Sequence, residues 1–166
     1  MVKHGIGIAA ALLLLAGSAG AQEPFGIAIA TEGDSAPPRR LRVALTVPAN
    51  HYLYADEVAI EPHGLAWTVA NRPRPRHHFD PFFEKKTAIY DRDVQFVYDL
   101  PAESPAEWTV TVSLQGCNES VCFPPWSGTF RVTADGTVVP VSDDEPDVDA
   151  GKDGGLDGFT VVATAT

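Results

Sequence analysis

Short runs of alternating apolar residues, each of strand length, recur along the middle of the chain between Pro, Gly, Asn and Asp residues. In 41–47 and 108–114 the apolar side chains stand at every second position, so each run would place them on one face of a strand. No apolar pattern at helical spacing extends over ten or more residues of this region. Similar short runs occur at 58–61, 65–70, 94–100, 129–133 and 137–141, and the dipeptide Asp135-Gly136 is a hairpin signal between the last two. About seven strands at intervals of roughly 10 residues predict an all-β fold, an immunoglobulin-like antiparallel β-sandwich in a single domain, with a small closed barrel as the alternative.

The N-terminus has the pattern of a secretory signal peptide. Lys3 and His4 precede an apolar stretch over 6–16, and Ala19-Gly20-Ala21 offers a small-x-small cleavage site. The apolar stretch is far shorter than the roughly 20 residues that cross a bilayer, so a cleaved peptide over 1–21 is favoured over a membrane anchor. We therefore expect secretion into an oxidising space outside the cytoplasm, in which paired thiols can form a disulfide.

The charge of the chain points away from nucleic acid and toward an acidic tail. The formal net charge is -10, and the expected signal peptide contributes one Lys and no acid. Residues 142–166 mix much of the acidic charge with Gly and Pro, which predicts a flexible tail. With an N-terminal extension over 22–39, one domain remains over 40–141, enough chain for one core. So acidic a chain is not expected to bind nucleic acid, and we expect a monomer.

The two cysteines of the chain, Cys117 and Cys122, lie close together in the run GCNESVCFPP behind a strand-like segment. On the chain-entropy account, so short a loop restricts the unfolded state by only about 2 kcal/mol, against about 4 to 5 kcal/mol for a loop of a hundred residues. A redox pair needs two sulfurs within bonding reach and one accessible to a partner, and this spacing fits a tight hairpin. Gly116 would permit a backbone turn, and Pro124-Pro125 would stiffen the exit.

Three interpretations of the pair remain open on the residues alone. It is a small stabilising bridge, of the kind common in secreted proteins, or a reversible redox pair. In the third interpretation, Cys117 and Cys122 join His77 and His78 as four ligands for Zn or Cu. The thioredoxin pattern C-x-x-C and the haem-attachment pattern C-x-x-C-H are both absent.

Residues 72–86, RPRPRHHFDPFFEKK, crowd basic, imidazole and aromatic side chains together without strand alternation. This pattern predicts a long connection, and long ordered loops in compact domains tend to carry function. There are two interpretations of Arg72, Arg74 and Arg76. Either they are solvated side chains of this loop, or they orient an acidic partner.

Several of these motifs together resemble one known family. The run GCNESVCFPP after a strand is similar to the redox motif of the N-terminal periplasmic domain of the thiol:disulfide interchange protein DsbD. Residues 51–54, HYLY, resemble the tyrosine-containing strand beside that family's active site, and residues 80–85, DPFFEK, resemble its cap loop. The resemblance covers residues 40–135, in order and at compatible spacing.

The resemblance implies a domain that takes two electrons from a membrane-embedded thiol reductant, supplied in trans, and passes them to periplasmic thioredoxin-like proteins. This is the activity of a thiol-disulfide oxidoreductase and needs no cofactor beyond the cysteine pair. Carried over by residue, Cys122 forms the mixed disulfide with the partner and Cys117 resolves it. Phe82 is the aromatic that covers the disulfide, and the site is completed by Phe83, Asp80, Glu84, Tyr52 and Tyr54.

Two cap positions depart from the family pattern, since Glu84 stands where a glycine is expected and Pro81 where an acid is expected. Two other functions compete with redox exchange. One is a non-catalytic immunoglobulin-like binding module with an inert bridge, and the other is periplasmic copper or zinc handling.

Overall fold

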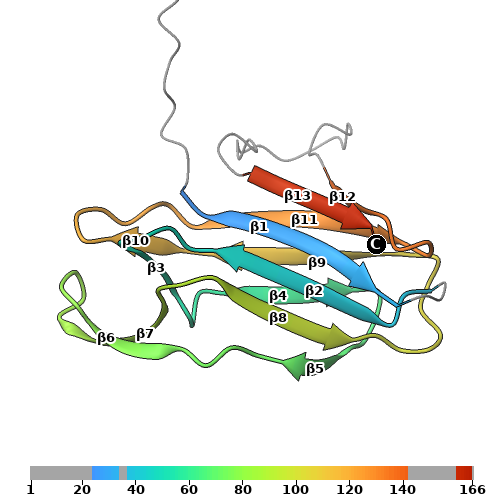
Figure 1. The fold of residues 1–166 in the computed structure, drawn as a ribbon, viewed down its shortest axis with the longest axis horizontal. Coiled ribbons are helices and arrows are strands. Elements are labelled where there is room, and N and C mark those ends of the chain that lie inside the picture. The colour runs from blue at the N-terminus through green and yellow to red at the C-terminus, as the bar shows by residue number, and fades with distance from the viewer. Residues whose placement is uncertain (1–23, 34–36, 142–159, 166) are drawn as a thin grey trace, which may run out of the picture.

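The computed structural model describes residues 24–33, 37–141 and 160–165, the last as backbone only. The expected signal peptide and residues 142–159 of the expected tail lie outside these residues. Within the described ranges every regular element is a strand (Figure 1). The all-β prediction is therefore confirmed, and each of the seven runs singled out in the sequence contributes a strand.

The described residues form thirteen strands in three sheets, and every pair among these strands is antiparallel except β1 with β13. The first sheet has the order β13 (Thr160–Ala165), β1 (Gly26–Glu32), β2 (Arg40–Thr46), β8 (Val94–Asp99) and β5 (Thr68–Asn71). The second has the order β12 (Val138–Pro140), β11 (Trp126–Thr133), β9 (Glu107–Leu114) and β4 (Ala59–His63). The third, which we call the site sheet, has the order β10 (Gly116–Asn118), β3 (His51–Tyr54), β7 (Lys85–Tyr90) and β6 (Arg76–Asp80).

The first two sheets pack face to face over the main core. Leu41, Val43 and Leu45 of β2 are at most 1% exposed, as their alternation predicts. The matching row of β9, from Trp108 to Leu114, buries its side chains in the same cluster. Burial of each such side chain stabilises the fold by about 1.5 to 3 kcal/mol, so register in these strands is strongly specified.

The structure corrects the prediction that residues 72–86 form a long loop. They contain β6 and the first two residues of β7, joined by a turn over residues 81–84 that we call the cap turn, and only 72–75 form a connection without regular structure. The alternation that normally indicates a strand is missing because β6 is an edge strand whose side chains, Asp80 apart, are exposed or only half-buried.

The predicted domain boundaries also differ from the structure at both ends. Residues 26–32 fall in the expected N-terminal extension, yet they form β1, whose register with β2 runs over the whole strand. Ile27 and Ile29 of β1 are 2% and 1% exposed, which ties this strand to the core. Residues 160–165 of the expected flexible tail form β13 alongside β1.

Candidate redox site

The site sheet separates the main core from a second, smaller cluster. Leu53 of β3 and Tyr90 of β7 belong to the main core. Their neighbours in sequence point to the opposite face, because side chains alternate along a strand. That face holds the second cluster, which consists of Tyr52, Tyr54, Ile89 and Cys117, with Cys122 packed against it.

Backbone pairing between β10 and β3 fixes the position of the first sulfur. Cys117 lies opposite Tyr52, so these side chains project from the same face. Cys117 and Cys122 form an isolated bridge at the base of a tight hairpin and are joined as a disulfide, with Cα atoms 4.0 Å apart. The hairpin expected from the spacing of the cysteines is therefore present.

Asn118 closes the loop between the two cysteines. Its Oδ1 accepts hydrogen bonds from the amides of Ser120 and Val121, each at 2.8 Å. The backbone amide of Asn118 donates to the Val121 carbonyl at 2.9 Å. An Asn that accepts hydrogen bonds from turn amides in this way is a recognisable turn residue, although no role was predicted for Asn118.

Gly116 serves close packing here and does not supply the unusual backbone turn that its sequence position suggested. A Cβ at this position would lie 2.3 Å from Phe25 Cζ and 2.6 Å from the Tyr52 carbonyl oxygen. Phe25 is 2% exposed and meets Phe123 edge to face, with ring centroids 5.7 Å apart. Phe25 therefore packs against the base of the hairpin formed by residues 116–123, which we call the redox hairpin. Nothing in the sequence around Phe25 indicated that role.

The two sulfurs differ in accessibility. Cys117 is completely buried, whereas Cys122 is half-buried at the edge of the cluster. Because a partner must reach the sulfur that it attacks, only Cys122 is placed to meet one.

A buried tyrosine connects both sulfurs to a buried carboxylate. Tyr54 Oη lies 3.1 Å from Cys117 Sγ and 3.7 Å from Cys122 Sγ. It donates a hydrogen bond to Asp80 Oδ2 at 2.6 Å. In the disulfide form the sulfurs carry no proton, so the phenolic proton belongs to the bond with Asp80. In the reduced form a Cys117 thiol could donate to Tyr54 Oη in turn.

Asp80 is fully buried but well satisfied. Its Oδ1 accepts hydrogen bonds from the amides of Phe82 at 2.8 Å and Phe83 at 3.1 Å. Burial alone would raise the pKa of Asp80, but the hydrogen bonds from Tyr54, Phe83 and Phe82 outweigh it and hold the pKa below its usual value. Burial and the bond to Asp80 both raise the pKa of Tyr54, so the phenol stays protonated.

Replacing the carboxylate at Asp80 should remove stability in a pH-dependent way. Asp80→Asn keeps an oxygen for the turn amides but loses the charge-assisted bond from Tyr54, at a cost of about 2 kcal/mol at pH 7. Because the folded pKa is lowered, the carboxylate stabilises the fold above its unfolded pKa of about 3.9, and this contribution disappears as the pH falls through the folded value. The gap between wild type and Asp80→Asn in urea unfolding should therefore persist from pH 7 down to about pH 4 and shrink as the pH falls further.

Asp135→Asn is the matched control for that experiment. Hydrogen bonds, first that from Thr133, lower the pKa of Asp135 as well, but its carboxylate lies in the β11–β12 hairpin, away from the disulfide. The difference in unfolding free energy between wild type and Asp135→Asn should also shrink at low pH. The rate of thiol exchange of Asp135→Asn should equal that of wild type. A stability gap for Asp80→Asn that is constant over the whole pH range would contradict the assignment.

The cap turn brings Phe83 over the site. The Phe83 ring packs on Tyr54, with ring centroids 5.8 Å apart. Lys85 Nζ lies over the Phe83 ring, 5.4 Å from its centroid. Phe82 is 46% exposed, and its role as the cover of the disulfide stays a prediction. Glu84 adopts a left-handed conformation, with φ of 52°, where the family pattern led us to expect glycine. The backbone of the turn thus keeps a glycine-type conformation at a cost of about 1 kcal/mol.

The two adjacent histidines fall on opposite faces of β6. His78 shares the inner face with Asp80, and its ring lies 5.6 Å from that of Tyr52. His77 is exposed on the other face. Among the residues that the structure describes, no three His, Cys, Asp or Glu side chains gather as metal ligands.

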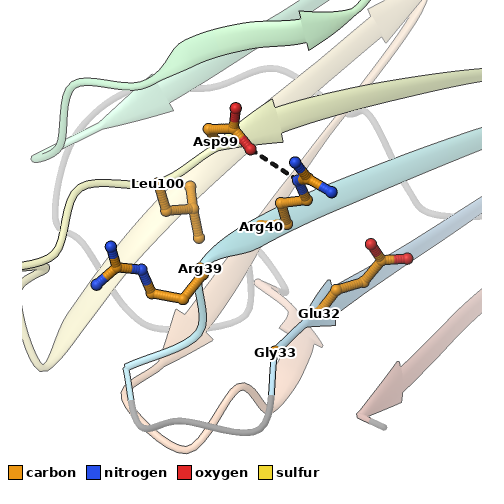
Figure 2. A pocket seen from close by; sticks show the side chains of 6 residues that line it. All are labelled: Glu32, Gly33, Arg39, Arg40, Asp99 and Leu100. Atoms are coloured by element: carbon orange, nitrogen blue, oxygen red, sulfur yellow. Dashed lines mark hydrogen bonds and ion pairs between the residues drawn. The ribbon is translucent and has the colours of Figure 1, made fainter.

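None of the predicted site residues lies in the cleft drawn in Figure 2. That cleft is lined by the end of β1 and the regions of Arg39, Arg40 and Asp99. It lies at the end of the first sheet remote from β10 (Figure 1). No described helix is long and apolar enough to cross a membrane.

Fold and site together define an immunoglobulin-like domain that carries one accessible and one buried sulfur in a tyrosine-lined, partly capped disulfide. The sequence profile of the family described as thiol:disulfide interchange protein DsbD, N-terminal, matches residues 26–134. The chain therefore belongs to the family of DsbD N-terminal domains. It is a domain for thiol-disulfide exchange, as the resemblance of its motifs implied.

Two solved structures from Neisseria meningitidis share the fold. The reduced DsbD N-terminal domain superposes with a TM-score of 0.53 and 16% identity, over 71% of this chain and 90% of that chain. The complex between the DsbD N-terminal and the PilB N-terminal domains gives a TM-score of 0.54 and 19% identity, over 71% and 89%. These likenesses confirm the immunoglobulin-like fold. No match was found among curated protein sequences.

Proposed function

We propose that this domain is a periplasmic electron carrier that accepts two electrons from a membrane-embedded thiol reductant and delivers them to thioredoxin-like proteins. The expected signal peptide supports the location, and membership of the DsbD N-terminal family supports the chemistry. The related domain of Neisseria meningitidis forms a complex with the PilB N-terminal domain, which supports delivery to a separate protein.

The unequal exposure of the two sulfurs carries the proposed mechanism. In the reduced domain, the Cys122 thiolate attacks a partner disulfide, forms an S–S bond to one partner sulfur and expels the other as a thiolate. The Cys117 thiolate then attacks Cys122 Sγ, which restores the internal disulfide and releases the second partner sulfur. Two electrons pass to the partner, and the two thiol protons end on its sulfurs.

Tyr54 and Asp80 are suited to handle the proton on the buried sulfur. Cys117 must lose its proton to attack, yet burial opposes a free thiolate. Tyr54 Oη lies 3.1 Å from Cys117 Sγ and, in the disulfide form, donates its proton to Asp80. When Cys117 becomes a thiolate, this single phenolic proton turns from Asp80 Oδ2 to Cys117 Sγ, and the phenol stabilises the resolving thiolate by donating a hydrogen bond to it. The cycle restarts when a membrane dithiol attacks Cys122 and reduces the pair.

The decisive measurement is whether the folded domain exchanges electrons reversibly. The domain should equilibrate with graded mixtures of reduced and oxidised dithiothreitol without loss of its folded circular-dichroism signal, and trapping of free thiols should give a single two-electron midpoint. The reduced domain should then reduce a thioredoxin-like protein, whereas a variant with both cysteines changed to Ser should not. A disulfide that opens only after unfolding would overturn the proposal in favour of an inert bridge in a binding module.

A further inference from the structure

The segment 72–86, which we call the basic hairpin, has a charge opposite to that of the rest of the chain. It contains five of the 12 Lys and Arg residues but only two of the 22 acids. The remaining chain therefore carries seven basic and twenty acidic residues. The formal net charge is +3 for the segment and -13 for the rest of the chain. Arg74, Lys85 and Lys86 of the hairpin are exposed, while Arg76 is paired with Asp91.

The basic hairpin also carries much of the exposed apolar surface. Among the described residues, the large apolar side chains that are exposed include Phe79 at 59%, Phe82 at 46% and Phe83 at 58%. Val121, beside the accessible sulfur, is 48% exposed. Figure 1 shows the β6–β7 hairpin and β10 at the same end of the domain. Phe83, with Lys85 above its ring, packs on Tyr54, and Tyr54 Oη lies 3.7 Å from Cys122 Sγ. Exposed aromatic surface and a cation at the cap turn thus lie close to the half-buried Cys122.

We infer that the basic hairpin is the docking surface for a redox partner whose own reactive cysteine is surrounded by acidic residues. This inference rests on the proposed function. The net negative charge of the rest of the chain repels an acidic partner, whereas the hairpin attracts it, so the partner approaches with the disulfide in front of it. A basic partner would be drawn to the acidic remainder of the chain, away from the site. The charge distribution therefore favours the orientation in which an acidic partner faces the disulfide, and it raises the rate of encounters that lead to thiol exchange.

The acidic residues of the chain itself at 142–159 are the competing occupant of the hairpin. The two possibilities respond to salt with opposite signs. Screening weakens attraction to a separate acidic partner, so the exchange rate falls as salt rises. If the chain's own acidic segment covered the hairpin, screening would release it, and the rate would rise instead.

The test uses two synthetic cystine peptides of equal length, one with three Asp residues around the disulfide and one with three Asn residues. The second-order rate of reduction by the reduced domain is measured at about 20 mM and about 500 mM salt. At low salt the Asp peptide should react at least about threefold faster than the Asn peptide, and high salt should remove most of this advantage.

Variants locate the effect. Lys86→Glu and Arg74→Glu should each slow the Asp peptide by about three- to tenfold at low salt and leave the Asn peptide unchanged. Arg39→Glu makes the same change in net charge at the remote cleft, where the Arg39 side chain extends away from the Arg40–Asp99 ion pair (Figure 2), and it should have no effect.

Equal rates for the two peptides, an equal effect of Arg39→Glu, or a rate that rises with salt would each overturn the inference. Failure of the proposed function has a different signature, because neither peptide would then be reduced by the domain at any salt concentration.

Discussion

Reduced Cys117→Ser protein should accumulate a covalent mixed disulfide with a partner, whereas Cys122→Ser protein should form almost none. Cys122 is the accessible sulfur, so it can attack a partner disulfide without Cys117, and the adduct then persists because no second thiol resolves it. In Cys122→Ser the remaining thiol is completely buried beneath Tyr52 and Tyr54, where a partner cannot reach it. We expect at least about a hundredfold difference in the rate of adduct formation.

The measurement is non-reducing electrophoresis and mass spectrometry after mixing each reduced variant with oxidised thioredoxin-like protein. Both variants lack the disulfide, so they are matched in that respect, and circular dichroism confirms that both are folded. Equal trapping on the two cysteines, or trapping on Cys117 alone, would show that the roles of the sulfurs have been assigned wrongly.

Gly116→Ala should be the most destabilising small change near the site. The added methyl would overlap the Phe25 ring and the Tyr52 carbonyl, and the carbonyl belongs to a strand that pairs on both sides. Overpacking of this kind costs about 3 kcal/mol, which corresponds to a fall in Tm of roughly 10 to 15 °C for a domain of this size. Thermal unfolding of the oxidised protein measures it.

Gly64→Ala is the control for that substitution. A methyl at Gly64 meets nothing within 4 Å, although its φ of 83° makes any side chain mildly strained. It should therefore cost about 1 kcal/mol, from backbone conformation alone. If Gly116→Ala lost no more stability than Gly64→Ala, close packing beneath the redox hairpin would not be the reason for glycine at position 116.

The fold was predictable where one side of a strand is buried and the other is exposed. The alternating runs over β2 and β9 mark the buried rows that the structure contains. The pattern failed for β6, where edge exposure removes alternation. It also failed for β3, where both faces are buried, and that strand was recognised only by its resemblance to a family motif. β1 was overlooked because its buried row has only two large apolar residues, Ile27 and Ile29, and because Gly and Ala at the alternate positions make the contrast between its two faces weak.

The candidate site was predictable from the sequence only in part. The cysteine pair and the tight hairpin follow from local spacing, and the aromatic residues near it came from the family resemblance. Phe25 was beyond reach because it meets the hairpin through packing between segments about ninety residues apart in sequence. The turn bonds of Asn118 are local and could have been found from its position between the cysteines.

By itself the sequence determined that this chain folds as strands and holds two sulfurs within bonding reach, because alternation and short spacing are local properties of the chain. Only the tertiary structure decided which sulfur a partner can reach and which buried groups serve it. Exposure and the Tyr54–Asp80 contact depend on how β10, β3 and the cap turn come together, and that arrangement is set by pairing between distant segments.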